Sequence, residues 1–236
     1  MEPLRYRSKL VVDGCEPGKF DEAFASSADS IMFENEEHVP HELKPAARQW
    51  IADFMSNPAR LEGKLVQIRT NAVWSTYYRD DLSAFLIPGV DIIVLPKVEV
   101  PEQVLAAAEA IDAYERQRSL SRIGIVATIE TPKALRLVSD IARSHPRLRG
   151  LQIGYEDLFK QNGISPNSGA ADVARFQVKM AAAEAGISAF DGRYTSDTST
   201  HEAYRLEALK AVELGFTGKT CSDADQIAIA NDVFPK

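Results

Sequence analysis

The chain has 236 residues, of which 45% are hydrophobic and 26% charged, and this length is enough to bury one large core. Its formal net charge of −7, with lysine and arginine scattered along the chain, argues against nucleic acid as a partner, because phosphate binding needs a clustered basic face. Two distant cysteines and the lack of an apolar stretch of signal-peptide or membrane-span length predict a soluble protein of the reducing cytoplasm.

Short β-branched or apolar runs alternate along the chain with longer segments of helical periodicity. The runs that predict strands are, in chain order, 9–12, 30–33, 64–68, 91–95, 123–129, 150–153, 186–190 and 216–220. The helical segments are 17–27, 41–55, 79–86, 101–117, 131–144, 170–185, 199–213 and 223–233. Eight strands, each followed by a helix, predict an α/β protein with one (β/α)₈ TIM-barrel domain over residues 1–236.

Polar residues at the carboxyl ends of barrel strands point into the active site. The residues at these ends are Asp13, Glu34, Glu36, Glu37, Arg69, Asn71, Lys97, Glu99, Glu130, Glu156, Asp157, Asp191 and Arg193. Carboxylates that crowd together raise one another's pKa unless a cation lies among them. A bound divalent metal ion is the simplest explanation of so acidic a rim.

Glu130 and Asp157 end the fifth and sixth predicted strands. These strands are neighbours in a barrel, so the two side chains can converge on one ion. Two carboxylates, completed by water and substrate oxygens, suit Mg²⁺ better than Zn²⁺. The alternative is that both acids only compensate the dipoles of the helices that follow them.

Arg69 ends the third predicted strand, where a planar guanidinium can bind a substrate carboxylate through two parallel hydrogen bonds. Its alternative role is to hold the acidic rim together through ion pairs. The acidic run 34–38 offers ligands, bases or charge balance, and is otherwise a solvated loop. His41, His145 and His201 occupy helical or surface positions, and no Gly-x-Ser-x-Gly motif supports a hydrolase triad.

Short motifs along nearly the whole chain carry a family resemblance. They are Arg7-Ser8, Ala28-Asp29, Val39-Pro40, Arg69-Thr70-Asn71-Ala72, Val94-Leu95-Pro96-Lys97-Val98-Glu99, Ile129-Glu130-Thr131, Gly154-Tyr155-Glu156-Asp157-Leu158, Asp191-Gly192 and Gly215-Phe216-Thr217-Gly218-Lys219. In this order they resemble the citrate lyase beta-subunit branch of the HpcH/HpaI aldolase family. The resemblance implies a TIM-barrel, Mg²⁺-dependent carbon–carbon lyase or aldolase that assembles as a trimer or hexamer.

The resemblance also implies roles for individual residues. Glu130 and Asp157 are expected to bind Mg²⁺. The expected catalytic residues are Arg69, Glu34 and Glu37, and the expected substrate contacts are Arg69, Asn71, Lys97 and Arg7. The substrate is expected to be a citryl-CoA-like or malyl-CoA-like thioester, or an aldol of a 2-oxo acid, cleaved through a metal-stabilised enolate.

Several positions depart from the family pattern. Asp13, Asn35 and His38 replace residues that are typical of the family, and the chain ends soon after Phe234, without the C-terminal helical extension of the acyl-CoA-cleaving members. These departures leave room for a free 2-oxo acid as substrate. They also leave open a diverged metal-dependent activity, such as hydrolysis, decarboxylation or condensation, and a non-catalytic barrel subunit.

Overall fold

The computed structural model describes residues 4–192 and 200–235. Its strands are β1 (Ser8–Asp13), β2 (Ser30–Glu34), β3 (Leu65–Arg69), β4 (Ile92–Leu95), β5 (Gly124–Ile129), β6 (Leu148–Ile153), β7 (Ser188–Phe190) and β8 (Lys219–Cys221). They form one parallel sheet in the order β7-β6-β5-β4-β3-β2-β1-β8. A bridge between Asp191 and Lys219 joins the two edges, so the strands form the predicted barrel.

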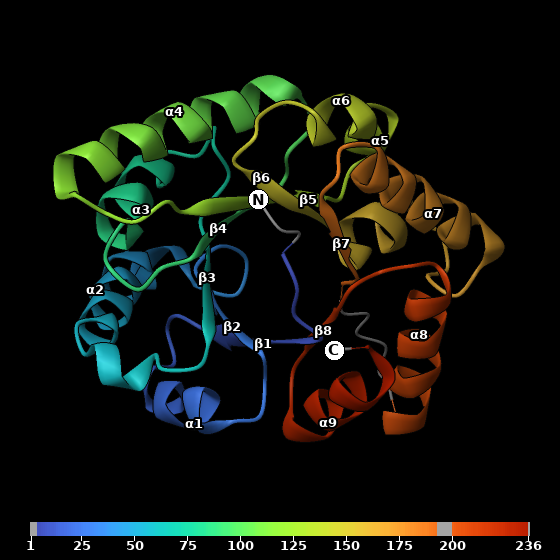
Figure 1. Ribbon diagram of the computed structural model, residues 1–236, viewed down its shortest axis with the longest axis horizontal. Coiled ribbons are helices and arrows are strands. Elements are labelled where there is room, and N and C mark those ends of the chain that lie inside the picture. The colour runs from blue at the N-terminus through green and yellow to red at the C-terminus, as the bar shows by residue number, and fades with distance from the viewer. Residues whose placement is uncertain (1–3, 193–199, 236) are drawn as a thin grey trace.

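Helices surround this barrel (Figure 1). They are α1 (Phe20–Ala25), α2 (Lys44–Met55), α3 (Tyr78–Phe85), α4 (Pro101–Arg118), α5 (Pro132–Arg136), α6 (Val138–Ala142), α7 (Gly169–Glu184), α8 (His201–Glu213) and α9 (Ala224–Val233). Short turns of other helix types are η1 (Pro17–Lys19), η2 (His41–Leu43), η3 (Pro58–Arg60) and η4 (Glu156–Lys160). No helix in the described ranges is long and apolar enough to cross a membrane.

The last strand differs from its predicted position. The sequence places a strand at 216–220, whereas β8 begins at Lys219. Phe216 is buried in the core between the barrel and its helices, and Gly218 passes so close to the carbonyl oxygen of Tyr6 that no side chain fits there. The apolar run therefore serves first as a packing segment, and only its end pairs with β1.

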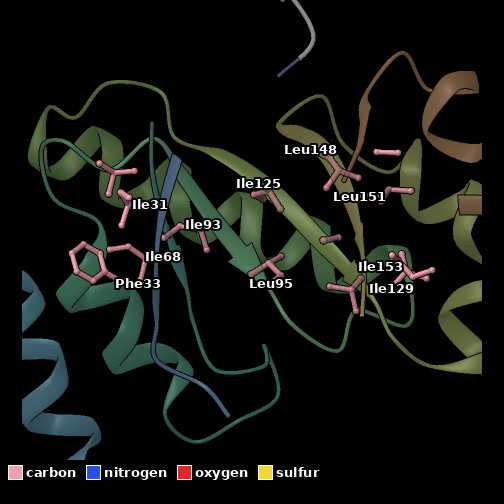
Figure 2. Packing of buried hydrophobic residues seen from close by; sticks show 14 of the residues in the cluster. Ile31, Phe33, Ile68, Ile93, Leu95, Ile125, Ile129, Leu148, Leu151 and Ile153 are labelled. Atoms are coloured by element: carbon pink, nitrogen blue, oxygen red, sulfur yellow. The ribbon is translucent and has the colours of Figure 1, made fainter. Parts of the chain in front are cut away.

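Side chains alternate between the two faces of the strands, as extended backbone requires. Ile31 and Phe33 of β2 pack in the helix-facing core, together with the other strand residues labelled in Figure 2. Met32, between them, belongs to a separate buried cluster in which Tyr6 stacks on Phe190 at 4.0 Å between ring centroids. This second cluster packs inside the barrel, below the carboxyl ends of the strands.

Candidate functional site

A cavity of about 290 Å³ lies at the carboxyl ends of the strands, and we call it the inner chamber. Val11 and Met32 line it beside polar groups. Its lining includes five carboxyl groups, those of Glu34, Glu37, Glu130, Glu156 and Asp157. Against these acids stand one guanidinium, that of Arg69, and one imidazole, that of His38. This excess of acids is the electrostatic setting in which a cation is expected to bind.

A second cavity of about 570 Å³, the outer chamber, adjoins the first. Both chambers are lined by Glu37, Glu130 and Asp157. The residues that belong to the outer chamber but not to the inner one are Trp74, Lys97, Glu99, Thr131, Pro132, Gln161 and Asn162. The two chambers therefore meet at the two carboxylates that the sequence predicts as metal ligands.

Arg69 lies at the centre of the acidic groups of the inner chamber. Its Nε lies 3.0 Å from Oε2 of Glu34, and its Nη2 donates to Glu36 and, at 3.2 Å, to Glu37. Burial opposes the charge of the guanidinium, but Glu34, Glu36 and Glu130 raise the pKa of Arg69 above its ordinary value. The ion-pair role that the sequence left open is therefore present, and none of these contacts uses Nη1.

Glu34 is the most deeply buried of these acids, with 1% of its surface exposed. Its Oε1 accepts the backbone N–H groups of Glu36 at 2.6 Å and Glu37 at 2.9 Å, which ties the following loop to the end of β2. Burial raises the pKa of Glu34, while Arg69 works in the opposite direction. These contacts let Glu34 orient Arg69 and the loop that carries Glu37.

Glu130 follows β5 and is also buried, at 6% exposure. Its Oε1 accepts the backbone N–H of Lys97 at 2.5 Å, and Lys97 itself has a left-handed backbone with φ of 52°. A Cβ on Gly154 would lie 2.6 Å from Oε2 of Glu130, so only glycine leaves room for this carboxyl group. The backbone at two loops is thus shaped around Glu130.

The electrostatic state of Glu130 is unusual for a carboxyl group. Burial raises its pKa from 4.5 to about 7, Arg69 and the Lys97 N–H oppose this, and Asp157 and Glu36 add to it. Burial and the neighbouring Glu37 also raise the pKa of Asp157. A carboxylate held in such surroundings gains more from a bound cation than one that is already fully solvated or paired.

Asp157 lies in η4, a short π-helical turn directly after β6, and its Oδ1 accepts a hydrogen bond from the side chain of Gln161. No group of three or more His, Cys, Asp or Glu side chains in the described ranges is arranged to hold a metal ion. Glu130 and Asp157 supply two carboxylates, and Mg²⁺ commonly takes its other ligands from water and substrate. The donor set therefore fits Mg²⁺.

Lys97 reaches this site, as the sequence predicts. Its Nζ donates to Oε1 of Glu36 at 2.8 Å, and its side chain lines the outer chamber. Burial lowers the pKa of Lys97, but Glu36 raises it above its ordinary value. Burial raises the pKa of Glu36, but Arg69 and Lys97 lower it below its ordinary value. Lys97 and Arg69 are thus joined through one shared carboxylate.

Asn71 does not line either chamber. Its backbone N–H and its side-chain amide both donate to Oδ2 of Asp81 at 2.7 Å, and the amide also donates to the backbone oxygen of Asn35. Asn35 in turn donates to Oδ1 of Asp81. The two amides and Asp81 together anchor the loops that follow β2 and β3, so Asn71 supports the site from behind.

Arg7 is not brought to the site at all. It precedes β1, at the amino ends of the strands, and donates through Nε and Nη2 to Asp29 at 2.8 and 2.7 Å. The expectation that Arg7 contacts substrate in this site has to be corrected, because parallel strands separate their two ends by the length of the barrel. Arg193, another candidate at the rim, lies outside the described residues.

His38 lies at the site, although the sequence did not predict a specific role for it. Its imidazole lines the inner chamber, and its Nδ1 lies 2.9 Å from Oδ1 of Asp13. The Asp13 hydrogen bond raises the pKa of His38, burial opposes this, Glu34 adds to it and Arg69 counters it. The signal in the sequence is that Asp13 and His38 both depart from the family pattern, and that Asp13 ends β1 whereas His38 follows the neighbouring strand β2.

Comparisons with known proteins agree with this geometry. Citrate lyase subunit beta from Haemophilus influenzae is 32% identical over 232 residues, covering 97% of this chain and 79% of that protein. A (3S)-malyl-CoA thioesterase from Cereibacter sphaeroides is 29% identical over 231 residues, covering 97% and 77%.

Solved structures show the same architecture. The protein CitE from Mycobacterium tuberculosis, in complex with magnesium, acetoacetate and coenzyme A, superposes with a TM-score of 0.79 at 25% identity, covering all of this chain and 82% of that one. The sequence profile described as HpcH/HpaI aldolase/citrate lyase matches residues 7–224. This chain therefore belongs to the HpcH/HpaI aldolase/citrate lyase family, as its motifs predicted.

Proposed function

We propose that this carbon–carbon lyase uses Mg²⁺, held by Glu130 and Asp157, to cleave or form the bond between the hydroxyl-bearing carbon of a carboxylate-bearing substrate and the carbon alpha to its oxo or thioester carbonyl. The observation that carries the proposal is the junction of the two chambers at these carboxylates, with Arg69 in the same cavity. The relatives named above support it, since one is a citrate lyase subunit and another is solved with magnesium and acetoacetate. The substrate is a 2-oxo acid aldol or an acyl-CoA thioester.

When bound by Glu130 and Asp157, Mg²⁺ would supply Lewis-acid polarisation of a substrate oxygen. The chain's own cations orient the substrate. Arg69 offers Nη1 to the substrate carboxylate, while Glu34 and Glu36 hold Nε and Nη2 in place. Glu37 is the most exposed of the three partners of Arg69, with 44% of its side chain exposed, so it is the one that a substrate carboxylate displaces.

His38 moves the proton that this reaction requires. In the cleavage direction, the unprotonated Nε2 takes the proton of the substrate hydroxyl, the carbon–carbon bond breaks, and the same proton is returned to the enolate carbon. Asp13 accepts from Nδ1, which fixes the tautomer with Nε2 free to accept. One imidazole therefore balances the protons, and Glu34 acts by positioning Arg69 rather than by transferring a proton.

Calorimetric titration of Mg²⁺ tests the metal site directly. The wild-type chain is expected to bind one Mg²⁺, and Glu130→Gln and Asp157→Asn are expected to abolish this binding. Glu99→Gln is the matched control, because Glu99 lies at the same rim but is bound by Thr131 and Lys133. Binding that survives in Glu130→Gln and Asp157→Asn would show that these carboxylates are not the ligands.

We further propose that the lyase works as a homo-oligomer, a trimer or hexamer, in the cytoplasm. Val173, Phe176 and Met180 form an exposed apolar stripe on α7, which supports association. Cys15 and Cys221 are not disulfide-bonded, which suits a reducing compartment. Light scattering of the purified chain tests the assembly, and a monomer at micromolar concentration contradicts it.

A further inference from the structure

The outer chamber provides space beside the proposed metal site that neither Mg²⁺ nor a carboxylate bound to Arg69 would fill. The inner chamber, at about 290 Å³, has room for a small oxo acid bound at Arg69 and the metal ligands. The outer chamber, at about 570 Å³, continues from Glu130 and Asp157 toward solvent. A substrate whose reacting end occupies the inner chamber therefore extends its distal part into the outer one.

Trp74 is the largest apolar side chain that faces the outer chamber, and 70% of its surface is exposed. Pro132 lines the same chamber, so an apolar ring and an apolar edge border one space. An indole ring left in water at a cavity wall gains hydrophobic and stacking energy when a planar group covers it.

The loop that carries Trp74 is held in place. Ser75 closes a turn by donating its backbone N–H to Ala72 at 2.7 Å, and Asn71 anchors the start of the loop on buried Asp81. Arg48 donates to the other oxygen of Asp81 at 2.7 Å. The backbone that carries the indole is therefore preorganised, which reduces the entropy that a ligand has to offset on binding.

Charge in the outer chamber disfavours a polyanionic ligand. Its titratable lining, counted over the described residues, is Lys97 with four acids, Glu37, Glu99, Glu130 and Asp157. Lys97 is already paired with Glu36, and Mg²⁺ neutralises only Glu130 and Asp157. The diphosphate of coenzyme A would find no unpaired cation among these lining groups, whereas an uncharged ring meets no electrostatic penalty.

We propose that Trp74 determines substrate specificity by stacking on an uncharged aromatic group at the distal end of the substrate, so that an aromatic aldol of a 2-oxo acid, and not a coenzyme A thioester, is preferred. This inference rests on the proposed function, because the reacting end is placed by Mg²⁺ and Arg69. It assigns the choice between the two substrate classes to the outer chamber.

Calorimetry of the Mg²⁺-loaded chain with pyruvate and with phenylpyruvate tests the proposal without turnover. The phenyl ring is expected to tighten binding about three- to tenfold, the range typical of aromatic stacking. Trp74→Ala is expected to abolish this ratio while leaving the pyruvate affinity unchanged, and Trp74→Phe is expected to retain most of it. Leu105→Ala, an exposed apolar residue on α4 outside both chambers, is the matched control.

The outcomes separate this inference from the proposed function. If neither pyruvate nor phenylpyruvate shows Mg²⁺-dependent binding, the proposed placement of a 2-oxo acid by Mg²⁺ and Arg69 fails and takes the inference with it. If pyruvate binds but Trp74→Ala leaves the phenylpyruvate ratio unchanged, the inference alone is overturned. Cleavage by the wild-type chain of malyl-CoA with higher kcat/KM than 4-hydroxy-2-oxo-4-phenylbutanoate also overturns it.

Discussion

Replacement of Glu130 by glutamine is expected to stabilise the metal-free protein while removing its response to Mg²⁺. Glu130 is buried, and its pKa is raised from 4.5 to about 7, first by burial. A folded-state pKa above the unfolded one means that the stability linked to this group is present below pH 4.5 and is lost as the pH rises to 7. Ionisation of Glu130 therefore destabilises the native state above neutral pH.

The size of the effect follows from the difference in pKa. A difference of about 2.5 corresponds to about 3 kcal/mol at pH values well above 7. For a chain of this length, about 3 kcal/mol raises Tm by about 6–12 °C. Glutamine keeps an oxygen for the Lys97 N–H, and Arg69 keeps its contacts with Glu34 and Glu36. The new amide NH₂ takes the place of Oε2 beside Gly154, and its burial offsets part of the gain.

Thermal unfolding of wild type and Glu130→Gln, with and without Mg²⁺, at pH 5 and pH 8.5, measures both effects. The metal-free variant is expected to be more stable than wild type at pH 8.5 and nearly equal to it at pH 5. Saturating Mg²⁺, at about 100 times Kd, is expected to stabilise wild type by about 3 kcal/mol and the variant hardly at all. The reasoning is refuted if the metal-free variant melts below wild type at pH 8.5, or if Mg²⁺ raises its Tm equally.

Three further predictions concern other groups of the site. Asp13→Asn is expected to lower the pKa of His38, so the acidic limb of the pH profile of kcat/KM at saturating Mg²⁺ moves to lower pH. NMR titration of the imidazole is expected to show a pKa shift in the same direction. If the acidic limb does not move, His38 is not the base. Arg69→Lys is expected to raise the KM for a carboxylate substrate about 10- to 100-fold, since one ammonium cannot replace the guanidinium fork, and an unchanged KM in steady-state assays removes Arg69 from substrate binding. Gly154→Ala is expected to destabilise the chain by about 1–3 kcal/mol in chemical denaturation and to weaken Mg²⁺ binding, because its Cβ meets Glu130; unchanged Mg²⁺ affinity contradicts the close approach.

The sequence by itself determined the barrel and much of its rim. Eight apolar runs separated by helical segments leave few architectures other than a closed parallel barrel, and their order survives small errors in strand ends. The period of two in extended backbone also places Glu34, Arg69 and Glu130 on the same face as the inward residues two positions earlier. These features depend on the local order of apolar and polar residues along the chain, which the sequence shows directly.

Only the tertiary structure decided how the rim is divided between binding and support. Arg7 and Asn71 look like site residues in a motif, but Asp29 and Asp81 hold them in other places. Partners far apart in the chain cannot be paired from local pattern, because their meeting depends on loop paths. For the same reason, the contact of His38 with Asp13 cannot be predicted from the sequence, because it depends on the path of the loop after β2.

The cavity beside the metal ligands is likewise a property of the folded chain. Trp74 reads in the sequence as one apolar residue in an irregular segment, with nothing to show whether it packs inward or faces a ligand. Its exposure follows from the anchoring of its loop on Asp81 and from the space left between the loops after β3, β4 and β6. The alternation of residues along the strands determined which side chains reach the carboxyl ends of the barrel. The packing of the loops decided the shape of the cavity that these side chains line.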